Sequence, residues 1–243
     1  MTFAAGLDNA IIDSHGCRLL GGLYRAAGET LRPTAILLHG VPGAEKNLDI
    51  AYALRDEGWN CLYFHYRGCW GSEGVYSFNG LTDDVHAATE WVLRQPSVDS
   101  NRLALVGSSM GGYIVLTVGA GDPRFKALVS MCPLVDPTKA MLPIEKFTEF
   151  AAMLNGVTGQ ELNSQWAALP PVRTVIRQLT GRQILLVSGE EDELFPPAHH
   201  QPIAEAIPGL TWERIMGADH QFSLRRKQLV EIVVHWLTTR LGK

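Results

Sequence analysis

The chain has 243 residues, of which 46% are hydrophobic and 19% are charged. This balance is typical of a globular protein with one sizeable core, and it excludes a disordered chain. The net charge of −4 and the lack of a basic cluster exclude nucleic acid and anionic membranes as expected partners.

The N-terminal residues lack the basic start, apolar core and small-residue cleavage site of a signal peptide. No apolar run approaches the length of a membrane span. We therefore expect a cytoplasmic protein that does not enter the membrane. Its thiols are expected to be reduced, because four cysteines lie without C-x-x-C spacing: Cys17, Cys61, Cys69 and Cys132.

Two strands around a turn are expected at the start of the chain, at 10–13 and 18–24. After them, short apolar runs alternate with segments of helical periodicity. The expected strands are 34–38, 60–65, 102–106 and 126–131, and the expected helices are 48–57, 81–94 and 110–120. This alternation predicts an α/β fold, with a mostly parallel, doubly wound sheet and an antiparallel N-terminal start.

The alternation stops between 133 and 180, where only helical spacing occurs. Thr158 and Glu161 have the spacing of a capping box ahead of one of these helices. The βα pattern then resumes with strand 183–187, a helix after Pro196-Pro197, strand 210–215 and a final helix with an apolar stripe. We therefore predict one core domain, 1–132 and 181–243, with a helical cap inserted at 133–180.

A candidate nucleophile lies in Gly107-Ser108-Ser109-Met110-Gly111, between an apolar strand and an apolar helix. A serine on a sharp strand-to-helix turn needs glycine two residues before it and two after it, because side chains there would collide with neighbouring elements. Ser109 fits this frame and Ser108 does not. The motif in this context predicts Ser109 as a nucleophile.

A serine hydroxyl needs a base within hydrogen-bond reach, and the chain has eight histidines. The serine turn resembles that of the α/β-hydrolases, in which the acid and the histidine follow the serine in the chain, and this resemblance excludes His15, His39, His65 and His86. His235 falls within the final helix, and His199 and His200 begin another helix. His220 follows an expected strand, at the sheet edge where α/β proteins place catalytic groups, and it is the predicted base.

The acid that orients His220 is less sharply defined. Asp192 is favoured in Gly189-Glu190-Glu191-Asp192-Glu193, because Gly189 permits a turn after the strand and the fold restarts soon after. Asp136, which follows the preceding strand, remains the alternative.

The loop His39-Gly40-Val41-Pro42-Gly43 follows the first expected parallel strand. Its glycines let the backbone approach a substrate carbonyl, and Pro42 has no N–H. We therefore expect the N–H groups of Val41 and Met110 to stabilise an oxyanion, with His39 holding the loop in place.

Three large side chains are candidates for the substrate pocket. Trp70 lies in a loop at another strand end, and Met141 and Phe147 belong to the expected cap. The cap is expected to cover the pocket and to select small to medium acyl groups.

Together, HGVPG, YRGCWGSEG, GSSMGG, GEEDELFP and GADHQF resemble the ordered motifs of the α/β-hydrolase superfamily, from about Leu19 to the C-terminus. Within it, the chain is similar to small serine esterases related to the dienelactone-hydrolase and prolyl-oligopeptidase-like groups. Dienelactone hydrolases use cysteine where this chain has Ser109, and the chain lacks the propeller of the large peptidases. Neither a lactone substrate nor peptidase activity is therefore implied.

The expected activity is hydrolysis of a small-molecule carboxylic ester through an acyl-enzyme, without a metal or an organic cofactor. Thioesterase and amidase remain alternatives, because the same groups serve every acyl transfer. A ligand-binding protein with this fold is an alternative from another class. The sequence does not indicate the oligomeric state.

Overall fold

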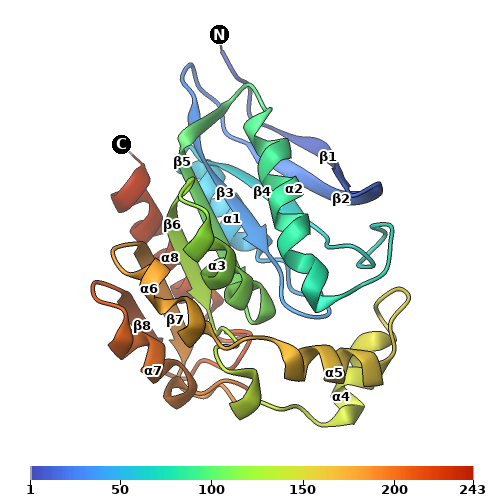
Figure 1. Cartoon of the computed structure of the whole chain (residues 1–243). Helices are drawn as coiled ribbons and strands as arrows, with labels where there is room; N and C mark the ends of the chain where they lie inside the picture. Colours follow the sequence, from blue (N-terminus) through green and yellow to red (C-terminus); the bar gives the residue numbers. More distant parts are fainter. Residues whose placement is uncertain (1, 243) are drawn as a thin grey trace.

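The computed structural model describes residues 2–242. Its centre is an eight-stranded sheet in the order β1-β2-β4-β3-β5-β6-β7-β8, with helices on both faces (Figure 1). The strands are β1 Gly6–Ser14, β2 Cys17–Arg25, β3 Arg32–Leu38, β4 Asn60–Phe64, β5 Val98–Ser108, β6 Phe125–Met131, β7 Gln183–Gly189 and β8 Thr211–Ile215. β2 runs against both of its neighbours, and the pairs from β4 to β8 are parallel. The predicted fold class is confirmed.

Two helical layers cover the sheet. Helices α1 (Leu48–Asp56) and α8 (Arg226–Leu241) pack on one face, and α2 (Leu81–Leu93), α3 (Met110–Gly121) and α7 (Pro197–Ala206) on the other. Successive residues of each parallel strand point to opposite faces and therefore enter different layers of the core. In β5, Leu103 and Leu105 belong to the α2–α3 side, whereas Ala104 and Val106 belong to the α1–α8 side.

The segment between β6 and β7 contains only short helices: η2 (Pro137–Lys139), α4 (Ile144–Ala151), α5 (Gly159–Ala168), η3 (Val172–Val175) and α6 (Ile176–Leu179). The capping box at Thr158 and Glu161 is confirmed at the start of α5. Helices α4 and α5 lie together beyond the carboxyl ends of the strands (Figure 1). The division of the chain into a core domain and a cap stays a prediction.

One buried tryptophan connects α5 to the rest of the protein. Trp166 is 1% exposed, and its ring contacts Phe78 of the short helix η1 (Phe78–Gly80) and Phe195 of the loop after β7. Its indole N–H donates to the Ala140 carbonyl oxygen at 3.1 Å. Aromatic packing therefore joins this helical segment to the loop that carries Asp192.

Between residues 2 and 242, no helix combines the length and the apolar character needed to cross a bilayer.

Candidate active site

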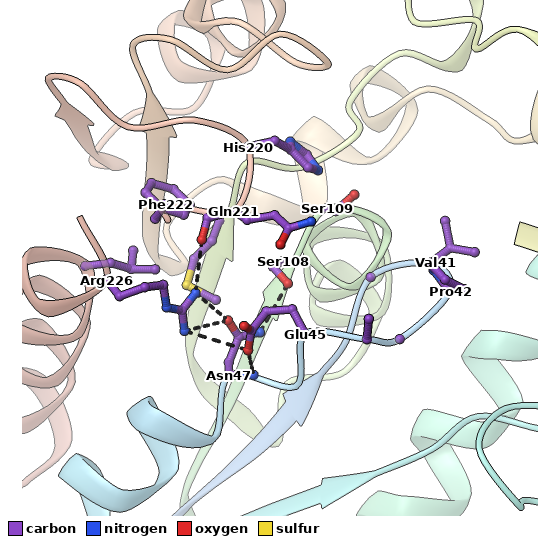
Figure 2. Close-up of a pocket in the computed structure, with 15 residues that line it drawn as sticks. Val41, Pro42, Glu45, Asn47, Ser108, Ser109, His220, Gln221, Phe222 and Arg226 are labelled. Carbon is purple, nitrogen blue, oxygen red and sulfur yellow. Dashed lines mark hydrogen bonds and ion pairs between the residues drawn. The ribbon is translucent and has the colours of Figure 1, made fainter. Parts of the chain in front are cut away.

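Ser109 lies on the turn that joins β5 to α3 (Figure 2). Its backbone has φ 56° and ψ −118°, a conformation that residues with side chains rarely adopt. A Cβ atom on Gly107 would come within 2.5 Å of the Gly111 carbonyl oxygen. A Cβ atom on Gly111 would come within 2.0 Å of the Leu38 carbonyl oxygen. Both positions therefore require glycine, which is the steric reason for the motif around Ser109.

Asp192 and His220 lie on the loops that follow two neighbouring strands, β7 and β8. His220 Nδ1 donates to Asp192 Oδ2 at 2.8 Å. The other carboxylate oxygen accepts hydrogen bonds from the backbone N–H groups of Leu194 and Phe195, at 2.9 and 2.8 Å. These contacts fix the carboxylate, and they favour the tautomer in which Nε2 of His220 is free to accept a proton.

Asp192 is 3% exposed, so the charge of its carboxylate depends on its hydrogen bonds. Burial alone would raise the pKa of this group, but contacts with His220, Phe195 and Cys132 bring the pKa below its usual value. Cys132 lies beside the carboxylate, and burial together with the charge of Asp192 raises the pKa of its thiol. An ionised carboxylate therefore faces a protonated thiol at neutral pH.

Asp136, the alternative acid, has a local role. Its Oδ1 atom accepts hydrogen bonds from the Thr138 backbone N–H at 3.1 Å and from the Thr138 hydroxyl at 2.6 Å, which caps η2. Among the described residues, no hydrogen bond or ion pair joins Asp136 to His220, whereas Asp192 contacts it at 2.8 Å. The structure therefore brings Asp192, and not Asp136, to His220.

Two other histidines near this edge of the sheet support the backbone. His199 Nε2 accepts a hydrogen bond from the Val135 N–H at 2.9 Å. His200 contacts the Ser188 hydroxyl at 2.8 Å and the Pro133 carbonyl oxygen at 2.9 Å. Burial lowers the pKa of each histidine to about 4, so both rings are neutral at neutral pH.

The loop after β3 passes close to Ser109. A Cβ atom on Gly40 would lie 3.0 Å from the Ser109 Cβ atom, so only glycine allows this approach without displacement of the serine. Val41 and Ser109 line the same pocket. Within the described chain, neither the Val41 N–H nor the Met110 N–H has a backbone acceptor. Val41 lines this pocket, Met110 is buried beside it, and the role of the two N–H groups as oxyanion donors stays a prediction.

His39 holds this loop, as the sequence predicts. Its Nδ1 atom donates to the Gly40 carbonyl oxygen at 2.7 Å, and its ring packs edge-on against Tyr66. Burial lowers the pKa of His39 to about 4, so the ring is neutral at neutral pH.

A pocket opens beside Ser109 and His220 (Figure 2). It extends along the starts of α1 and α8, and no residue of the segment 133–180 lines it. Its polar side chains include four that the sequence analysis did not single out: Glu45, Asn47, Gln221 and Arg226. Gln221 could have been found from its place beside His220. Asn47 and Arg226 are 179 residues apart in the chain, and no motif marks their contact.

The predicted pocket residues lie elsewhere. Trp70 donates from its indole N–H to the Pro42 carbonyl oxygen at 2.8 Å and thereby supports the loop after β3. Met141 is 49% exposed on the helical segment. Phe147 is fully buried against Phe150 and Trp166, so it belongs to the core of that segment. None of the three predicted residues lines the pocket beside Ser109.

Side chains that could bind a metal ion meet at Cys132, Asp192 and His220, whose ligand atoms all lie within 4.8 Å of one another. Zinc and related ions would need a free carboxylate oxygen here, but Asp192 Oδ1 already accepts hydrogen bonds from the Leu194 and Phe195 N–H groups. The Nδ1 atom of His220 is also engaged with Asp192. The donor set therefore fits a hydrogen-bonded acid and base better than a metal site.

A mostly parallel sheet with a serine turn after β5 and an Asp–His pair after β7 and β8 is the architecture of an α/β-hydrolase. Residues 49–243 match the model of the prolyl oligopeptidase family. Because this match covers most of the chain, the protein belongs to that family.

Curated proteins also match parts of the chain. The quorum-quenching protein AidA of Acinetobacter baumannii (strain MDR-ZJ06) is 30% identical over 167 residues, which are 65% of this chain and 55% of AidA. The chain spans about half the length of the curated relatives it matches.

Solved structures with the same fold include the α/β hydrolase GrgF from Penicillium sp. sh18, with a TM-score of 0.80 and 18% identity over 98% of this chain and 100% of that chain. Est1E from Butyrivibrio proteoclasticus with bound ferulic acid has a TM-score of 0.80 and 18% identity over 96% of this chain and 100% of that chain. At this identity, the two structures show the fold alone.

Proposed function

We propose that this protein is a serine hydrolase that cleaves carboxylic esters of small to medium acyl chain through an acyl-enzyme. The observation that carries the proposal is the 2.8 Å hydrogen bond from His220 to Asp192, because His220 lines the same pocket as the strained turn at Ser109. Support also comes from Est1E, whose bound ferulic acid is a carboxylic acid, the class of product that ester hydrolysis releases.

In the first step, the Ser109 Oγ atom attacks the ester carbonyl carbon, and its proton moves to His220 Nε2. Asp192 stabilises the imidazolium that forms and keeps Nδ1 protonated. The N–H groups of Val41 and Met110 hold the negative carbonyl oxygen, and each such donor contributes on the order of 10²-fold in rate. The C–O bond to the alcohol then breaks, and the leaving oxygen takes the proton from His220.

In the second step, water attacks the acyl-enzyme and gives one proton to His220. The bond between the acyl carbon and the Ser109 oxygen breaks, and His220 returns the proton to that oxygen. The carboxylic acid leaves and the enzyme is restored. The cycle is therefore complete with this chain's own residues and one water molecule.

Hydrolysis of p-nitrophenyl esters of increasing acyl length tests the proposal. We expect Ser109→Ala to lower kcat on the order of 10⁶-fold. Ser108→Ala is the matched control, because it removes a neighbouring hydroxyl and one 3.1 Å hydrogen bond from Asn47, and it should keep kcat within about tenfold of the wild type. Equal activity in all three proteins would show that Ser109 is not the nucleophile.

The same assay with matched thioesters and amides decides between the acyl transfers that share this machinery. We expect the oxygen ester to have the highest kcat/KM among substrates with one common acyl group.

A further inference from the structure

The pocket beside Ser109 has a polar wall that the acyl-transfer steps do not use. It is built from the start of α1, the start of α8 and the residue that follows His220 (Figure 2). Its side chains are those of Glu45, Asn47, Gln221 and Arg226, which we call the polar wall.

Arg226 is engaged within the protein. Its Nε atom donates to Asp49 Oδ2 at 2.9 Å, and Nη1 and Nη2 each donate to Asn47 Oδ1 at 3.2 Å. A second contact from Nη2 to Asp49 Oδ1 makes the ion pair bidentate. An anionic substrate would therefore have to displace the Asp49 carboxylate to bind this guanidinium.

Glu45 is different, because its charge is only partly balanced. Its Oε1 atom accepts a hydrogen bond from the Asn47 backbone N–H at 2.6 Å, and it lies 3.9 Å from Arg226 Nη2. Arg226 already pairs with Asp49, so two carboxylates share one guanidinium and the cluster keeps a net negative charge. The neighbouring cation, Lys46, lies over the ring of Trp70 and does not line the pocket.

The position of the polar wall indicates which part of an ester it faces. His220 must give its proton to the leaving alcohol oxygen, so the alcohol portion lies next to its ring. The polar wall continues from His220 through Gln221, whose side chain points toward Ser109 in Figure 2, to Arg226. A substituent on the alcohol therefore extends along this wall toward Glu45.

We propose that Glu45 selects esters whose alcohol portion carries an ammonium group. This inference rests on the proposed ester hydrolysis and names a substrate class for it. The Glu45 side chain is 42% exposed, so its attraction for a cation is screened by solvent and salt. A pair of this kind corresponds to about a twofold to fivefold preference.

The test compares 2-(dimethylamino)ethyl acetate with 3-methylbutyl acetate, which has the same shape and no charge. The wild type should show a kcat/KM about twofold to fivefold higher for the cationic ester at low ionic strength, and the ratio should fall in 0.5 M salt. In Glu45→Gln, which keeps an oxygen for the Asn47 N–H, the ratio should fall to about one. Glu57→Gln removes an exposed carboxylate at the far end of α1 and should keep the wild-type ratio.

The outcomes separate the two proposals. Turnover of both esters with equal kcat/KM in the wild type, or the same ratio in Glu45→Gln as in the wild type, would overturn the role of Glu45 and leave the hydrolase intact. Faster turnover of the anionic ester 3-acetoxypropanoate than of the cationic ester would also overturn it. No turnover of any ester would overturn both proposals.

Discussion

Replacing Asp192 with Asn changes one atom of the side chain and removes the charge that orients His220. Asp192 Oδ1 accepts two backbone hydrogen bonds, from Leu194 and Phe195, and an Asn side chain would keep its carbonyl oxygen at that position. The amide nitrogen would then face His220 Nδ1 in place of Oδ2. Because that nitrogen can only donate, the histidine proton would move to Nε2, and Nε2 could no longer accept the proton of Ser109.

This change of tautomer is expected to lower kcat on the order of 10⁴-fold, which corresponds to about 5.5 kcal/mol of transition-state stabilisation. The matched control is Asp136→Asn, which makes the same chemical change at the alternative acid. Asp136 contacts Thr138 and not His220, so its variant should stay within about tenfold of the wild type.

The assay is hydrolysis of a p-nitrophenyl ester, with kcat and KM measured for the wild type and both variants. A thermal-unfolding scan verifies that each variant is folded. If Asp192→Asn retained activity within tenfold, or if Asp136→Asn lost as much activity as Asp192→Asn, the assignment of the acid would be wrong.

Three further predictions concern stability. Gly111→Ala should lower the free energy of unfolding by about 3 kcal/mol, because the added Cβ atom would lie 2.0 Å from a carbonyl oxygen of β3. Gly121→Ala in the same helix adds a Cβ atom that meets nothing within 4 Å, so it should be neutral or stabilising. Urea unfolding measures both variants, and equal effects would contradict the steric argument. Trp166→Ala should cost about 3–5 kcal/mol in the same measurement, and a loss below 1 kcal/mol would show that this residue does not join α5 to the core. Burial lowers the pKa of His39 and of His200 to about 4, against about 6.5 in an unfolded chain, so the unfolded state binds protons first as the pH falls. The stability that depends on their neutral forms is therefore complete above about pH 6.5 and is lost progressively toward pH 4, by about 2 kcal/mol per histidine at pH 5. A midpoint urea concentration that stays constant when the pH is lowered from 7.5 to 5 would contradict this.

Local patterns were sufficient to predict the fold and the serine turn. The alternation of apolar strands and helices is a local property, and the residues that build it pack on both faces of one sheet. The glycines around Ser109 are also a local signal, because the collisions that they avoid involve the turn itself and the adjacent β3.

The choice between Asp192 and Asp136 depends on which loop reaches His220, which the sequence does not state. Both residues follow a strand, and only the folded chain shows that the loop of Asp192 contacts His220. The polar wall was missed for a similar reason, because the contact of Arg226 with Asn47 joins two distant segments. Phe147 was wrongly predicted to line the pocket for a different reason. Helical spacing marks an apolar face but does not indicate whether that face meets substrate or other core residues.

The central claim is that Ser109 is a nucleophile activated by His220. Incubation with a fluorophosphonate probe, followed by mass spectrometry of the digested protein, tests it directly. We expect one adduct on Ser109 in the wild type and in Ser108→Ala, no adduct in Ser109→Ala, and strongly slowed labelling in His220→Ala. An unlabelled wild type, or an adduct that persists in Ser109→Ala, would contradict the account.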